Sequence, residues 1–99
     1  MILKPFYADY VNHMLRFYVR NPICMTQKTP EVANYLAVMA IFRTLTDQEQ
    51  GMLTAVYSEQ GNLAEIIRAY CKQTKTPPKV VWGLVNRVTK LVAQERGLV

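Results

Sequence analysis

The sequence predicts an all-α protein, a single compact bundle of about five helices. Hydrophobic residues make up 51% of the 99 residues, and no low-complexity tract is present. A chain of this length supports one modest core and no second domain. Helix-start signals built on threonine, asparagine and proline recur along it, each followed by apolar residues at helical spacing.

The first predicted helix covers residues 5–20. Its apolar stripe contains Tyr7, Tyr10, Val11, Met14 and Tyr18. Asn21-Pro22 ends the helix, because proline disfavours a helical conformation in the residue before it. Residues 23–28 are then expected to form a short loop.

The second predicted helix covers residues 30–44. Thr29-Pro30-Glu31 supplies a capping hydroxyl, a first-turn proline and an early acidic residue, which together indicate a helix start. The following YLAVMAIF is apolar nearly all round. Such a pattern is typical of a central core helix or of a helix buried in an oligomer.

Two further helices follow. Thr46 and Glu49 form a capping box, in which each side chain accepts a hydrogen bond from the other's backbone. This third helix continues to Gly61, which is well placed to end it. Asn62 starts a fourth helix that runs to Cys71, and residues 72–76 are polar and turn-like.

The last predicted helix covers residues 77–97. Thr76 is expected to cap it, prolines form its first turn, and Gly97 supplies a left-handed end. An apolar stripe contains Val80, Leu84, Val85, Val88, Leu91 and Val92. The opposite face contains Lys79, Gly83, Asn86, Arg87, Lys90 and Gln94.

Charge is distributed unevenly within the net value of +5. Residues 44–65 carry four acidic and no basic side chains, whereas residues 66–99 carry seven basic and one acidic. A basic end attracts polyanions, and nucleic acid is the polyanion we expect for a cytoplasmic domain.

Several function classes find no support in the sequence. The longest apolar run, residues 35–42, is far short of the roughly 20 residues of a membrane span, and we expect no signal peptide. His13 has no partner at a metal-ligand spacing, and Cys24 and Cys71 are expected to be buried thiols. Asp47 and Glu49 are explained by capping and the helix dipole. With no nucleophile elbow, phosphate loop or dinucleotide motif, we expect neither enzyme activity nor a metal or cofactor.

Residues 45–96 contain a set of positions that match the pattern of a known helical module. The matching positions are Leu45, Thr46, Glu49, Leu53, Tyr57, Leu63, Glu65, Ile66, Val81, Val85 and Arg87. In this pattern the segment resembles the helix-turn-helix region with which sigma factors bind promoter −35 elements, a module that small phage and mobile-element regulators also carry. The segments ADYVNHMLRFY and AQERGL look similar to small proteins of phages and conjugative elements of gut bacteria, which implies a mobile-element origin.

The resemblance divides the chain into a two-helix part, residues 1–44, and a helix-turn-helix-like part, residues 45–99. In the family, the turn between the two DNA-facing helices is tight and usually contains a glycine. Residues 69–78 contain none and suggest a turn two or three residues longer. Either the fourth helix is extended before a wider turn, or the last two helices do not pack as a DNA-reading pair.

The resemblance implies a DNA-binding transcriptional regulator whose last helix enters the major groove of duplex DNA. Asn86 and Arg87 are then the expected base readers, because an amide pairs with adenine and a guanidinium with guanine. Lys72, Lys75, Lys79 and Lys90 are the expected phosphate contacts. Gly83 would allow close approach of a backbone. The alternative is an exposed face on which Gly83 is merely tolerated.

The aromatic residues support a second hypothesis, a protein-interaction module, inhibitor or adapter that binds a host protein or a nucleoprotein complex. Its expected interface contains Phe6, Tyr10, Phe17 and Trp82. Trp82 is expected to be half-buried beside the apolar stripe, with interface anchoring as its second role. The excess aromatic residues of the first helix favour core packing plus a homodimer contact. A small obligate oligomer without a separate ligand is the third hypothesis.

Overall fold

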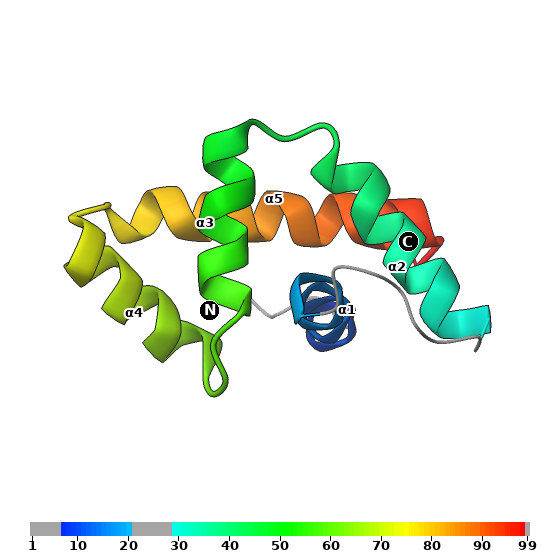
Figure 1. Cartoon of the computed structure of the whole chain (residues 1–99), viewed down its shortest axis with the longest axis horizontal. Helices are drawn as coiled ribbons and strands as arrows, with labels where there is room; N and C mark the ends of the chain where they lie inside the picture. The colour runs from blue at the N-terminus through cyan, green and yellow to red at the C-terminus, as the bar shows by residue number, and fades with distance from the viewer. Residues whose placement is uncertain (1–6, 21–28, 99) are drawn as a thin grey trace.

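The part of the chain that the structure describes folds as five α-helices, which confirms the predicted all-α class. The computed structural model describes residues 7–20 and 29–98, and that part of the chain contains no strand. In chain order the helices are α1 (Ala8–Arg20), α2 (Thr29–Phe42), α3 (Asp47–Tyr57), α4 (Leu63–Thr74) and α5 (Pro78–Arg96) (Figure 1). None of these helices is long and apolar enough to cross a lipid bilayer.

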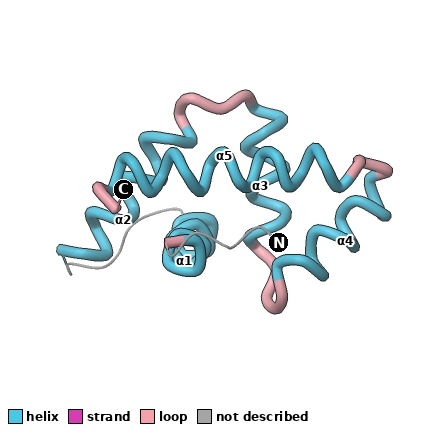
Figure 2. The backbone as a smooth tube through the Cα atoms, turned by 180° about the vertical axis from the view of Figure 1, so that it is seen from behind, coloured by secondary structure: helices cyan, strands magenta, loops and turns pink. Residues whose placement is uncertain are grey.

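Helix α5 is the centre of the fold, and all four other helices contact it. In both views, α3 and α4 lie beside its first half and α2 beside its second half, while α1 is seen end-on (Figures 1 and 2). The apolar sequence of α2 predicted either a central core helix or a helix buried in an oligomer. The first of these predictions is wrong, because α5 is the central helix. Helix α2 buries Tyr35, Val38 and Phe42 on one face and leaves Leu36 52% exposed.

The core draws on every helix. Its largest fully buried side chains are Val11, Met14, Leu15, Val38, Leu53, Val56, Tyr57, Ile67, Val81, Val88 and Val92. Each aliphatic side chain buried in this way stabilises the fold by about 1.5–3 kcal/mol. The ring of Tyr18 in α1 lies 4.9 Å from that of Tyr35 and 4.8 Å from that of Phe42, between centroids. These tilted aromatic contacts hold α1 against α2.

Three predicted helix ends are confirmed. The Thr46 N–H donates to Glu49 Oε1 at 3.0 Å, and the Glu49 N–H donates to Thr46 Oγ1 at 3.1 Å, which completes the capping box. The Glu65 N–H donates to Asn62 Oδ1 at 3.2 Å at the start of α4. Gly97 ends α5 at φ 81°, the left-handed conformation that glycine adopts without a steric penalty.

Two other predicted ends are wrong. Helix α3 ends at Tyr57, with Ser58 as its C-cap, and Gly61 lies in the following loop at φ 117°. The residue before α5 is Pro77 rather than Thr76, and it makes no side-chain capping hydrogen bond. The Thr76 hydroxyl instead lies 2.8 Å from the Thr74 hydroxyl, across the preceding turn.

The turn between α4 and α5 is shorter than the sequence suggested. Helix α4 continues past Cys71 to Thr74, so only residues 75–77 separate it from α5. Lys75 adopts the left-handed conformation, with φ 56° and ψ 32°, and its N–H donates to the Cys71 carbonyl oxygen. The fourth helix is therefore extended, as one alternative held, but the turn after it is tight. Lys75 occupies the conformation for which glycine is usually selected.

The buried stripe of α5 is rotated from its predicted position. Leu84, Val85, Val88 and Val92 are buried as expected, but Val80 is 50% exposed. Val81, Thr89 and Ala93 are buried instead. The rotation follows from packing on two sides, because α1 and α2 both contact α5. An apolar stripe predicted from the sequence alone assumes that other helices cover only one face of the helix.

Candidate nucleic-acid interface and adjoining groove

The exposed face of α5 carries four of the residues expected there. Lys79, Gly83, Asn86 and Lys90 are all exposed, and we call them the α5 strip. Their spacing of four, three and four residues keeps them on one side of the helix. The strip is about 16 Å long at 1.5 Å per residue. It therefore offers two lysines and an amide along two to three turns of one helix.

Gly83 is not required by packing within the chain. A Cβ atom placed there would meet nothing within 4 Å among the described residues. Helical glycine costs about 1 kcal/mol relative to alanine. The open space beside Gly83 is compatible with both interpretations of this residue, close approach of a partner and simple tolerance of a glycine.

Three lysines surround the α4–α5 turn. Lys72 lies in the last turn of α4, Lys75 lies in the turn between the helices, and Lys79 is the second residue of α5. All three side chains are exposed. Within the described part of the chain they make no ion pair or side-chain hydrogen bond. The predicted phosphate contacts Lys72, Lys75 and Lys79 thus lie in and on either side of the α4–α5 turn, and Lys90 lies further along α5.

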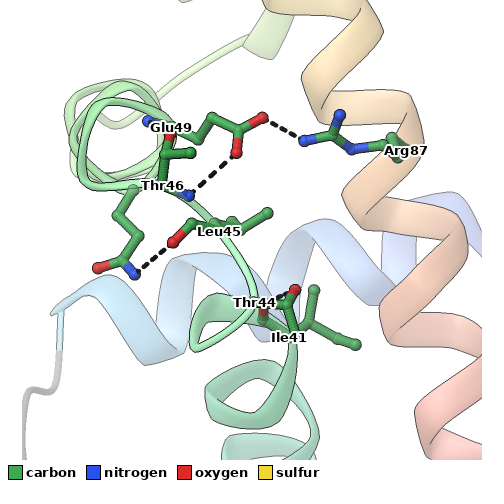
Figure 3. A network of polar contacts seen from close by, with 7 residues as sticks. Ile41, Thr44, Leu45, Thr46, Glu49 and Arg87 are labelled. Carbon is green, nitrogen blue, oxygen red and sulfur yellow. Dashed lines mark hydrogen bonds and ion pairs between the residues drawn. The ribbon is translucent and has the colours of Figure 1, made fainter.

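Arg87 has a partner that the sequence did not indicate. Its Nη2 donates to Glu49 Oε2 (Figure 3). The Arg87 side chain remains 53% exposed. The predicted base readers Asn86 and Arg87 are thus in different situations, since Asn86 is exposed and Arg87 is held by an ion pair.

The Glu49 carboxylate joins two helices. Its Oε1 completes the capping box of α3 and its Oε2 accepts from Arg87 of α5. The hydrogen bond from Thr46 N–H, followed by that from Arg87, lowers the pKa of Glu49. The sequence identified the capping box but not the ion pair, because 38 residues separate the two partners.

A groove adjoins the α5 strip. It has a volume of about 890 Å³ and lies between α1, the start of α4 and α5. The predicted residues Trp82, Asn86 and Lys90 line it from α5. The remaining lining residues are Tyr7, Ala8, Asp9, Asn12, His13, Arg16, Asn62, Leu63, Ala64, Val85 and Thr89. No local pattern predicted this groove, since its residues come from three separate segments.

Polar contacts between the helices involve three of the residues that line the groove, Asn12, Arg16 and Thr89. The hydroxyl of Tyr57, which has no exposed surface, donates to Asn12 Oδ1 at 2.9 Å. Burial raises the pKa of Tyr57, and a hydrogen bond with Thr89 acts in the opposite sense. Arg16 Nη2 donates to the Gly61 carbonyl oxygen. These contacts tie α1 to α3 and to the loop before α4, and they tie α3 to α5.

The predicted protein interface is not brought together as one patch. Phe6 lies outside the described residues. Tyr10 is 43% exposed, and its hydroxyl accepts from Asn34 Nδ2 of α2 at 2.9 Å. Phe17 is half-buried on α1. Trp82 is half-buried as expected, packs against the core and lines the groove.

The residues considered for metal or redox chemistry are dispersed. Among the described residues, no three histidine, cysteine or acidic side chains are grouped to hold a metal ion. His13 is exposed on α1 and Cys71 is a buried thiol. Cys24 lies outside the described residues.

Comparisons with protein-family models, curated proteins and solved structures find no significant match to this chain.

Proposed function

We propose that the protein is a small DNA-binding transcriptional regulator of phage or mobile-element type, with α5 in the major groove. The observation that carries this proposal is the cationic surface formed by the α4–α5 turn and the α5 strip. Lys72, Lys75 and Lys79 have no acidic partner among the described residues, so phosphates would meet no competing carboxylate there.

The roles along the surface follow from side-chain chemistry. Lysines neutralise phosphates and set the register of the helix, without reading sequence. Asn86, between Lys79 and Lys90, offers the amide that pairs bidentately with adenine. Gly83 brings the helix backbone closer to the DNA. Arg87 would contact guanine only after leaving Glu49.

A salt titration tests this proposal. Binding of a labelled DNA duplex is measured by fluorescence anisotropy for the protein and for the triple variant Lys72→Gln, Lys75→Gln and Lys79→Gln. Loss of three phosphate contacts should lower the slope of log affinity against log salt by about 2 to 3. Arg20→Gln, an exposed position on α1, is the control. Unchanged binding by the triple variant would exclude this surface.

Asn86→Ala tests base reading separately. It should reduce the discrimination between sites that differ at one base pair, by about 1–3 kcal/mol, while leaving the salt slope unchanged. A variant that weakens binding equally on every sequence would show that Asn86 does not read bases.

The regulator is expected to act as a homodimer. Leu36 is 52% exposed on α2, beside a shallow hollow lined by Ala33, Ala37, Glu95 and Arg96. An exposed leucine next to a hollow suits self-association. Light scattering of the protein and of Leu36→Glu tests this, and a monomer in both samples would exclude it.

The groove favours a second candidate function, binding of a partner protein. Trp82 presents part of its ring there, and tryptophan is a frequent anchor of protein interfaces. A partner retained on the immobilised protein after nuclease treatment and high-salt washing would support this function. Loss of every partner after nuclease treatment would favour DNA binding alone.

A further inference from the structure

The groove presents two matching rows of side chains. Asn12 and His13 share one turn of α1 and Arg16 lies on the next, while Trp82, Asn86 and Lys90 occupy successive turns of α5. The α5 row spans about 12 Å, which is the length of three or four residues of an extended peptide. The groove therefore has the dimensions of a short linear segment.

The groove is richer in hydrogen-bond donors than in acceptors. Asn12 Oδ1 already accepts from Tyr57, and Asn62 Oδ1 accepts from the Glu65 N–H. The Nδ2 group of each of these two side chains is therefore left as a hydrogen-bond donor for a ligand. Arg16 Nε is also buried without a hydrogen bond to any described residue.

The formal charges of the lining also favour a ligand that carries hydrogen-bond acceptors. Arg16 and Lys90 contribute two positive charges to the lining, against the single carboxylate of Asp9. A ligand suited to this lining carries acceptors and negative charge. It also carries an apolar side chain, because Trp82 and Val85 form part of the wall.

These features allow three candidate ligands of the groove to be compared: the chain's own first residues, a nucleic acid and an acidic peptide. The first six residues of the chain, MILKPF, contain Lys4 and no acidic side chain, so they lack the complementary charge. A nucleic-acid backbone would find two cations and no aliphatic partner for Ala8, Leu63 or Val85. An acidic peptide matches both the donors and the apolar wall.

We propose that this groove binds a short acidic segment of a partner protein. Carboxylates of the segment bind Lys90 and Arg16, its backbone carbonyl oxygens accept from Asn12 and Asn62, and one apolar side chain packs on Trp82. The proposal rests on the second candidate function and specifies the chemistry of the partner. It does not depend on DNA binding.

The test uses the full chain and a phage-displayed library of random dodecapeptides. Selected sequences should be enriched in aspartate and glutamate around an apolar residue. Synthetic copies are then titrated while the emission of Trp82, the only tryptophan in the chain, reports occupancy of the groove. Copies with Asn and Gln in place of Asp and Glu should bind at least tenfold more weakly.

Matched variants locate the binding site. Lys90→Gln should weaken peptide binding about tenfold, and Asn86→Ala should weaken it severalfold. Lys75→Gln removes the same charge at an exposed position outside the groove and should leave affinity unchanged. All three altered side chains are exposed, so circular dichroism should show the native helix content.

Five results would overturn the proposal. Selected peptides could lack acidic residues, or Lys90→Gln and Lys75→Gln could have equal effects. Peptide binding could also require deletion of residues 2–6, which would make the chain's own first residues the occupant. Preferential binding of single-stranded oligonucleotides at Trp82 would likewise exclude it. A partner protein bound equally by the groove variants would preserve the second candidate function while refuting this site.

Discussion

The carboxylate of Glu49 contacts the guanidinium of Arg87 and at the same time completes the capping box of α3. One side chain thus fixes the first turn of α3 and links that helix to α5. The same contact occupies Arg87, a predicted base reader, with an internal anion. The ion pair of Arg87 with Glu49 would therefore compete with the proposed base-reading role of Arg87.

Glu49 should make stability dependent on pH in the acidic range. Its pKa is lowered in the folded state, so its stabilising contribution is present above the unfolded pKa of about 4.3 and is lost as pH falls through the folded pKa. The difference in unfolding free energy between the protein and Glu49→Gln should be largest at pH 7 and smaller at about pH 3. Urea denaturation at both pH values measures it. Glu59→Gln, at an exposed loop position, should show no comparable loss; equal behaviour of the two variants would contradict the role of Glu49.

Glu49→Gln should also strengthen DNA binding if Arg87 reads bases. Glutamine retains a side-chain acceptor for the capping box, removes the carboxylate that faces the DNA side of α5 and releases Arg87. We expect a roughly threefold to tenfold gain in duplex affinity, with part of that gain screened at high salt. The effect should disappear in the double variant with Arg87→Ala. Weaker binding by Glu49→Gln would show that the ion pair positions Arg87 for DNA rather than withholding it.

Gly83→Ala separates stability from binding. No atom obstructs the new methyl group, so the variant should be more stable by about 1 kcal/mol, the helix preference of alanine over glycine. Thermal unfolding measures this gain. Gly51→Ala, in the interior of α3 with equally open surroundings, should be stabilised to the same extent.

Duplex affinity then distinguishes the two glycines. It should fall for Gly83→Ala and stay constant for Gly51→Ala, if the α5 backbone approaches DNA closely at position 83. Equal affinity of both variants would mean that Gly83 is merely tolerated.

Lys75→Gly should stabilise the protein by about 0.5–1 kcal/mol. Lys75 holds a left-handed conformation that crowds the Cβ atom of any residue except glycine. Lys72→Gly removes the same charge from the last part of α4 and should destabilise by about 1 kcal/mol. Opposite shifts in melting temperature for these two charge-matched variants are the expected result. Destabilisation by both would show that Lys75 makes a compensating contact.

The helix ends were predictable where the signal is local. Thr46, Asn62 and Gly97 cap their helices as expected, because a cap depends on residues three or four positions away. The end of α4 was not predictable, because its left-handed cap residue is Lys75 rather than glycine. A lysine in the position that glycine usually occupies gives no sequence signal, so the sequence predicts a longer turn that begins at Lys72.

The arrangement of helices was not predictable from local patterns. The apolar composition of α2 suggested a central helix, whereas α5 holds that place and contacts every other helix. Which residues of α5 are buried depends on two neighbouring helices. The groove combines Asn12, Asn62 and Trp82 from distant segments. On α5, the exposure of the lysines and Asn86 and the burial of Leu84, Val85, Val88 and Val92 could be inferred from the sequence.

The central position of α5 has a consequence for biosynthesis. Helices α1 to α4 leave the ribosome before their common packing partner exists, so Val11, Leu53 and Ile67 have no complete core to enter. Closure of the fold must wait for the last of the five helices. The nascent chain should therefore acquire its structure in one late step, with its apolar faces accessible to chaperones until then.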